Sequence, residues 1–212
     1  MARIEPFEKH YQDYEEWFSE NRYAYESELE AVRQLIPVDC KGLDIGVGSG
    51  RFAAPFGVKH GVDPSKEMAR YARRLGIEVR EGIAENLPYS DAEFDYALMV
   101  TTVCFIDDIE SAMKEIYRIL KPEGSLIIGL IDRESPLGNL YQKYKKDNPF
   151  YKIATFYSVD EILAQMRKGG FGNFVMRQTI FRSLNEINER EEVLAGYGKG
   201  SFVAVKGFKI KQ

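Results

Sequence analysis

Short, almost wholly apolar runs alternate with amphipathic segments over residues 41–131, and this rhythm restricts the fold more than any other feature. Five of the runs have the length of β-strands, and two amphipathic segments have the apolar spacing of helices. Runs that are apolar on both faces predict a parallel sheet covered by helices on each side, and right-handed crossovers make that sheet doubly wound. The expected strands cover 41–45, 58–62, 77–80, 94–100 and 125–131, and the expected helices cover 65–75 and 109–120.

The flanking segments follow other patterns. Residues 7–35 carry apolar side chains at helical spacing among many acids, which predicts one helix ended by Pro37. Residues 133–157 are polar, basic and aromatic, and they predict a lid or substrate wall. The C-terminal part predicts a helix and an antiparallel sheet edge: a helix over 158–168, strands over 174–182 and 201–210, and a short helix near 184–195.

Length and charge limit the class of protein. A chain of 212 residues predicts a single domain. Its net charge of −4 disfavours a nucleic-acid partner, and its longest apolar stretch, 96–106, is far shorter than the ~20 residues of a membrane-spanning helix. We expect a helical cap (1–37), a core (38–131), a lid insertion (133–157) and a C-terminal helix with antiparallel edge strands (158–212).

The two cysteines, Cys40 and Cys104, lie in apolar contexts without metal-ligand spacing. They predict reduced thiols in a cytoplasmic protein and no metal site. The N-terminus carries acids and has no apolar core of a secretory signal. The sequence leaves open whether the chain is a monomer or a homodimer.

A glycine-rich loop follows the first expected strand. Gly46, Gly48 and Gly50 permit positive φ angles and let a ligand approach bare backbone. Asp44 stands just before this loop, and Asp63 ends the second expected strand 19 positions later. An acid at that place accepts hydrogen bonds from both hydroxyls of a ribose, so the pattern predicts a nucleoside site.

The spacing in the loop distinguishes between cofactors. A dinucleotide fingerprint is G-x-G-x-x-G, whereas this loop reads G-x-G-x-G and has Arg51 where the third glycine would fall. The helix after it is short because of Pro55 and Gly57. Asp44 would repel a pyrophosphate but suits a cationic amine. A nucleoside with an amine and no phosphate describes S-adenosylmethionine.

Four blocks of the sequence resemble the motifs of the class I S-adenosylmethionine-dependent methyltransferases: LDIGVGSGRF, GVDPSKEMARYA, AENLPYSDAEFDYALMV and EIYRILKPEGSLIIG. The resemblance is to the branch with many small-molecule enzymes of the ubiquinone-biosynthesis type, and it covers residues 38–131 closely. It implies a Rossmann-like α/β fold with a doubly wound sheet of seven mostly parallel strands, the last one antiparallel. It also implies S-adenosyl-L-methionine as cofactor and S-adenosyl-L-homocysteine as product.

The resemblance assigns cofactor-binding roles residue by residue. Asp44 matches the acid that contacts the methionine amino group through water or the loop, and Asp63 matches the acid that holds the ribose hydroxyls. The other matching positions form the loop under the ligand and the adenine side: Gly46, Gly48, Gly50, Pro64, Ser65 and Met68.

The adenine contact departs from the family pattern. Many relatives have an acid that bonds the adenine amino group, and this chain has Ile83 there. Backbone groups of Ala84 or the side chain of Glu85 are the candidates for replacing it. Val100 and Thr101 match positions near the methionine end of the cofactor.

Methyl transfer from a sulfonium is an in-line displacement, so a general base is needed only when the acceptor must lose a proton. The catalytic candidates are Tyr14, Thr101 and Asp132, with Tyr11, His10 and Thr102 in the same segments. In this family the first helix often covers the cofactor, so Tyr14 or Trp17 would touch the ligand or the acceptor.

We therefore expect a methyltransferase that acts on a small molecule, with an oxygen, nitrogen or carbon acceptor all open. One alternative is a non-catalytic regulatory protein that binds S-adenosylmethionine. A nicotinamide-dependent oxidoreductase is a further alternative, which the loop spacing and Asp44 disfavour.

Overall fold

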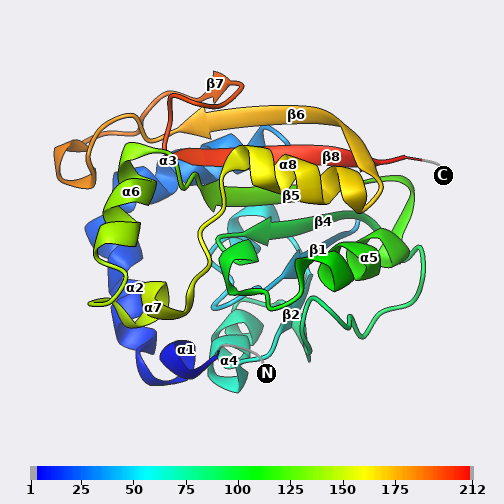
Figure 1. The fold of residues 1–212 in the computed structure, drawn as a ribbon. Coiled ribbons are helices and arrows are strands. Elements are labelled where there is room, and N and C mark those ends of the chain that lie inside the picture. The colour runs from blue at the N-terminus through cyan, green and yellow to red at the C-terminus, as the bar shows by residue number, and fades with distance from the viewer. Residues whose placement is uncertain (1–3, 211–212) are drawn as a thin grey trace.

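A single sheet with the order β3-β2-β1-β4-β5-β8-β6-β7 runs through the computed structural model, which describes residues 4–210 (Figure 1). Strands β1 to β5 are mutually parallel, β8 pairs antiparallel with β5, and β6 pairs antiparallel with β8. The predicted doubly wound sheet with an antiparallel last strand is confirmed. The strands are β1 (Gly42–Ile45), β2 (His60–Asp63), β3 (Glu78–Glu81), β4 (Phe94–Val100), β5 (Leu120–Ile131), β6 (Phe171–Thr179), β7 (Leu194–Ala195) and β8 (Phe202–Lys209).

Over residues 4–210 the sheet has eight strands, so the expected seven is wrong by one. The additional strand is β7, two residues that pair with β6. The helix expected near 184–195 is also wrong, because only Leu184–Glu186 forms a 3-10 turn. The polar chain after that turn lies along the sheet edge, where the Thr179 hydroxyl donates to the Glu192 carbonyl at 2.9 Å.

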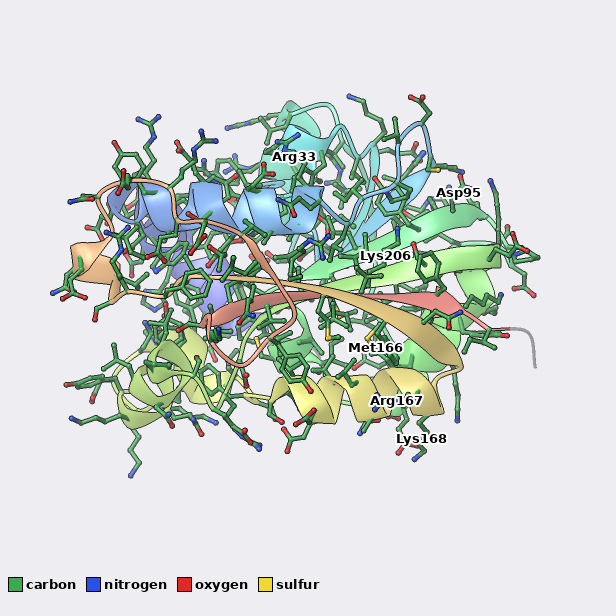
Figure 2. All side chains as sticks on the ribbon, turned by 90° about the horizontal axis from the view of Figure 1, so that it is seen from above. Arg33, Asp95, Met166, Arg167, Lys168 and Lys206 are labelled. Carbon is green, nitrogen blue, oxygen red and sulfur yellow. The ribbon has the colours of Figure 1, made fainter. Side chains whose placement is uncertain are left out.

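Helices cover both faces of the sheet, as the apolar runs predict. In Figure 2, Met166 points from one of these helices toward the sheet, whereas Arg167 and Lys168 point away from it. This alternation is the amphipathic pattern expected for a helix with one buried side. One face carries α3 (Arg22–Arg33) and α4 (Lys66–Arg74), and the other carries α5 (Ile109–Ile119) and α8 (Val159–Lys168).

Helix ends follow local capping chemistry. The Ser65 side chain accepts a hydrogen bond from the Met68 backbone and begins α4. Ser158 and Glu161 form a capping box at the start of α8. These serines satisfy backbone donors that a helix leaves unpaired, so both starts agree with the sequence.

The single helix expected over 7–35 is wrong. The chain forms α1 (Glu5–Lys9), α2 (Tyr11–Glu20) and α3 instead, with a break at Asn21 between the last two. The Asn21 side-chain amide donates to the Trp17 carbonyl at 3.1 Å, and its backbone leaves the helical region. Asparagine competes in this way with helical hydrogen bonding. The break lets α3 pack on the sheet while α2 lies across the end of it (Figure 1).

The insertion over 133–157 contains two helices, α6 (Pro136–Lys143) and α7 (Pro149–Ile153). Each begins with a capping residue followed by proline: Ser135 before α6 and Asn148 before α7. These Ser-Pro and Asn-Pro pairs were the helix signals in a segment that otherwise lacks periodicity. Figure 1 shows α6 and α7 beside α1 and α2 at one end of the sheet. Within residues 4–210 no helix is long and apolar enough to span a bilayer.

Candidate active site

A cavity of about 550 Å³ lies at the carboxyl ends of the parallel strands, where open α/β sheets bind ligands. Its walls come from the loops after β1, β2, β3 and β4 and from the helices gathered at that end of the sheet. Most of the predicted cofactor-binding residues line it: Gly46, Gly48, Asp63, Pro64, Ser65, Met68, Ala84, Glu85, Val100 and Thr101.

Asp63 joins the two loops that cradle this end of the cavity. One carboxylate oxygen accepts from the Gly48 backbone at 2.8 Å, and the other accepts from the Ser65 backbone at 2.8 Å. Burial raises the pKa of Asp63 to about 6, although the two backbone donors act to lower it. The carboxylate is therefore fixed in position, and because it also lines the cavity it can accept ligand hydroxyls.

Two predicted cofactor residues do not line the cavity. Asp44 is buried in β1, and its pKa is raised well above the ordinary value by burial and by the negative charge of Asp63. At Gly50, whose φ is +89°, an added Cβ would lie 2.8 Å from Ile77 Cδ1. Gly50 therefore lets the loop pack closely against its neighbours, whereas Gly46 and Gly48 are the glycines of the loop that line the cavity.

The N-terminal helices are tied onto the glycine loop by polar contacts. Arg51 pairs with Glu15 of α2, and Glu15 also accepts a hydrogen bond from the Ser49 hydroxyl. The Tyr25 hydroxyl of α3 donates to the Arg51 carbonyl. Arg51, which replaces the third glycine of a dinucleotide loop, thus holds the helical cap over the cavity.

The three catalytic candidates have different surroundings. Tyr14 lines the cavity, and its hydroxyl would lie 3.3 Å from a Cβ built on Gly48. Burial and the nearby carboxylate of Glu15 raise the pKa of Tyr14, so its hydroxyl keeps its proton and is available as a donor.

Thr101 lines the cavity with a φ of +53°, a strained conformation for a β-branched residue. Asp132 does not line the cavity, and its carboxylate accepts from the Glu134 backbone at 3.1 Å in a turn. Tyr11 and His10 also lie outside the cavity wall, and Tyr11 stacks on Tyr71.

Ile83, Ala84 and Glu85, the predicted candidates for the adenine side, line the cavity after β3. Glu85 accepts from the backbone N–H groups of Asp107 and Asp108 at 3.0 and 3.2 Å. The Glu85 carboxylate therefore holds a neighbouring loop, while Ile83 presents an apolar side chain to the cavity.

Five residues of the cavity wall form a group that we call the acceptor chamber, after the role that we propose for it: Trp17, Glu28, Tyr141, Tyr151 and Phe156. Tyr141 and Tyr151 stack with ring centroids 4.3 Å apart. Tyr141, Tyr151 and Phe156 lie within the predicted lid or substrate wall. Trp17 is named from the sequence as a contact, whereas Glu28 is missed. The signal for Glu28 was an acid within the apolar stripe of α3, next to the buried residues Ala24, Ala31 and Val32.

Comparisons with known proteins give the class of this one. Residues 43–128 match the Methyltransf_11 family, described as a methyltransferase domain. A solved S-adenosylmethionine-dependent methyltransferase from Thermotoga maritima, described as a possible histamine N-methyltransferase, is 51% identical with a TM-score of 0.95. That similarity covers 97% of this chain and 99% of the Thermotoga chain. The chain therefore belongs to the S-adenosylmethionine-dependent methyltransferases, and the resemblance in its motifs is confirmed.

Two further proteins are similar to this chain in sequence. An uncharacterised protein of Methanocaldococcus jannaschii is 44% identical over 96% of this chain and 98% of that protein. The demethylmenaquinone methyltransferase of Chlorobaculum parvum is 36% identical over 56% of this chain and 52% of that enzyme. The chain thus matches only about half the length of the quinone-methylating relative.

The methyl donor is S-adenosylmethionine, and the residues of the cavity fit it. A Cβ at Gly48, whose φ is +54°, would approach Tyr14 and Met68 to within about 3.4 Å and narrow the cradle between them. Asp63 lines the same cavity, and its carboxylate can accept hydrogen bonds from hydroxyl groups. The charged side chains that line the cavity, within residues 4–210, are all carboxylates, which suits a cationic sulfonium: Asp13, Glu28, Asp63, Glu85, Asp107 and Asp108.

Proposed function

We propose that this methyltransferase acts on a small molecule held in the acceptor chamber. The observation that carries the proposal is the continuity of the cavity, since the same space contacts Gly48 and Asp63 at one end and the chamber at the other. Its volume of about 550 Å³ lies within the ~300–1,000 Å³ typical of small-molecule sites.

When bound, S-adenosylmethionine supplies an activated methyl group, so the protein has to bind, orient and exclude water. Gly46 and Gly48 admit the donor against bare backbone, and Asp63 fixes its nucleoside. The aromatic rings of α2, α6 and α7 close the acceptor side and keep water from the reacting atoms.

Two observations favour a small acceptor over a nucleic acid. No lysine or arginine among residues 4–210 lines the cavity, whereas binding of a phosphate backbone relies on such residues. The Thermotoga relative is described as a possible histamine N-methyltransferase, and the Chlorobaculum relative as a demethylmenaquinone methyltransferase. Both acceptors are small molecules.

The test uses S-adenosylmethionine labelled in the methyl group and an extract divided into small molecules, RNA and protein. Label that enters the small-molecule fraction supports the proposal, and label confined to RNA or protein contradicts it. The Asp63→Ala variant is the negative control, because it should bind the donor poorly. Calorimetric titration with S-adenosylhomocysteine establishes first that the donor site is intact.

A further inference from the structure

Glu28 is an unusual residue for the place it occupies. It lies in the middle of α3, only 3% exposed, and it lines the acceptor chamber. Among residues 4–210 no group donates a hydrogen bond to its carboxylate and no cation pairs with it. A buried carboxyl group normally has such partners, so an unpartnered one that faces a cavity marks the place of a ligand.

The groups that face Glu28 are aromatic. Tyr25 comes from its own helix, Tyr141 from α6 and Tyr151 from α7. Burial raises the pKa of all three phenols, so all three are neutral at pH 7. Trp17 of α2 lines the same chamber. Glu28 is therefore the one ionisable group of the chamber that can carry charge at neutral pH.

The chamber chemistry selects a cation. Aromatic rings attract cations through their π faces, and a desolvated carboxylate gains most from an ammonium partner. An anionic acceptor would lie next to Glu28, and within residues 4–210 no lysine or arginine of the cavity wall would compensate its negative charge. A neutral alcohol would meet the protonated form of Glu28 and gain a hydrogen bond but no ion pair.

We propose, building on the proposed function, that the methyl acceptor is a small organic amine and that Glu28 binds its ammonium group. The step is an exchange of one proton: the ammonium binds, the Glu28 carboxylic acid ionises, and its proton leaves to solvent. The resulting pair is an ammonium and a carboxylate inside an aromatic chamber.

Because an ammonium has no lone pair, methyl transfer requires that one N–H proton pass back to the Glu28 carboxylate. The neutral amine then attacks the methyl group as the carbon–sulfur bond breaks, and S-adenosylhomocysteine leaves with the electrons of that bond. This inference gives the acceptor class, which the fold and the donor site leave open.

Burial supports the proton exchange. It raises the pKa of Glu28 to about 8 in the protein without acceptor, so the group is mostly protonated at pH 7. An ion pair with an ammonium requires the ionised form. Amine binding at pH 7 should therefore release close to one proton per site, as counted by calorimetry in buffers of different ionisation enthalpy.

The experiment compares three probes of similar shape: 2-phenylethylamine, 2-phenylethanol and 3-phenylpropionate, which are cationic, neutral and anionic. Each is titrated into protein saturated with S-adenosylhomocysteine. Wild-type protein should bind the amine at least about 10-fold more tightly than the other two probes. Equal binding of the alcohol, or no binding of the amine, would overturn the inference.

Variants assign the selectivity to Glu28. Glu28→Gln should lose about 30-fold in amine affinity and release no proton, with affinity for S-adenosylhomocysteine unchanged. Glu28→Asp keeps the charge and should retain a preference for the amine over the alcohol. Glu30→Gln is the matched control, because Glu30 is on the same helix, partly exposed, and pairs with Arg33. Wild-type behaviour in Glu28→Gln would contradict the proposal.

The readouts separate this inference from the function on which it rests. If the wild type does not bind S-adenosylhomocysteine, the donor site and the proposed function both fail. If it binds this product, and labelled methyl groups appear in small molecules that are not amines, only the role of Glu28 is refuted. Thermal unfolding of each variant with S-adenosylhomocysteine confirms that the chamber is compared in folded proteins.

Discussion

The two ends of the cavity are built in different ways. The donor end is formed by loops that follow β1, β2, β3 and β4, and its central contacts join Asp63 to Gly48, 15 positions earlier, and to Ser65, two positions later. The acceptor chamber combines Trp17 and Glu28, which precede the sheet, with Tyr141 and Tyr151, which follow β5. The donor end is thus local in the sequence, whereas the chamber depends on how the cap and the insertion meet.

Because of this difference, the two ends of the cavity tolerate different substitutions. Donor contacts rest on backbone geometry at strand ends, which tolerates few side chains: a Cβ at Gly46 would lie 2.2 Å from Thr102 Cγ2. The chamber rests on side chains of helices, which can be exchanged without altering the sheet. Substitutions at one end should therefore leave binding at the other end nearly intact, and the predictions below test that independence.

The largest expected effect is at Asp63. Replacing it by alanine removes the ribose contact and leaves the Gly48 and Ser65 backbone N–H groups without their partner. We expect about 100-fold weaker binding of S-adenosylmethionine by calorimetry, since a hydrogen bond to a charged group contributes roughly 1.5–3 kcal/mol.

The matched control for that change is Asp91→Ala, because the Asp91 side chain is 79% exposed and pairs with Arg118 on the surface. It should bind the donor like the wild type. Donor binding within threefold of wild type in Asp63→Ala would show that the glycine loop alone determines affinity.

The second effect concerns stability and pH at the chamber. The pKa of Glu28 is about 8 in the folded protein, above its ordinary value of 4.5, so the folded state binds more protons than the unfolded state between these values. Stability contributed by this group is present below pH 4.5 and is lost as pH rises toward 8. Glu28→Gln removes that loss.

Urea unfolding at pH 5 and pH 9 measures this pH-dependent loss of stability. Glu28→Gln should be about as stable as the wild type at pH 5 and a few kcal/mol more stable at pH 9. Glu30→Gln, two positions along the same helix, should show no such trend. A difference between Glu28→Gln and wild type that stays constant over this range would mean that water solvates the carboxylate.

Much of the donor end could be predicted from the sequence. The strand pattern, the positions of Gly46 and Gly48, and the role of Ser65 as a helix cap all depend on neighbours in the chain. Asp44 and Gly50 lie outside the cavity wall, and their cofactor roles stay predictions, since a motif gives positions but not which side chains reach the cavity.

The chamber could be predicted only in part. The break at Asn21 turns α3, and with it Glu28, toward the chamber, and a helical pattern running through 7–35 does not reveal that break. Tyr141 and Tyr151 meet across two short helices whose contacts are tertiary. Such residues become visible only when segments far apart in the chain are brought together.

The third effect tests the acceptor side alone. Trp17 lines the chamber, and truncation to alanine removes its ring from the wall. We expect about a 10-fold higher KM for the acceptor, with the dissociation constant for S-adenosylmethionine within twofold of wild type. Trp17→Phe keeps an aromatic wall and should recover most of the loss. An equal loss of donor affinity in Trp17→Ala would indicate that the two ends are coupled through α2.

The smallest effect sharpens the comparison from the donor side. Ile83 faces the cavity at the position to which the family resemblance assigns an adenine-binding acid, and Glu85 is held by the backbone of Asp107 and Asp108. Ile83→Asp should therefore add one hydrogen bond to adenine and tighten S-adenosylmethionine binding about threefold, since an exposed bond contributes roughly 0.5–1.5 kcal/mol. Ile83→Asn should give a smaller gain and Ile83→Val none. Weaker binding in Ile83→Asp would mean that the apolar side chain of Ile83 itself packs against the adenine ring. In that case the donor end binds adenine by apolar packing instead of a hydrogen bond from a side chain at this position.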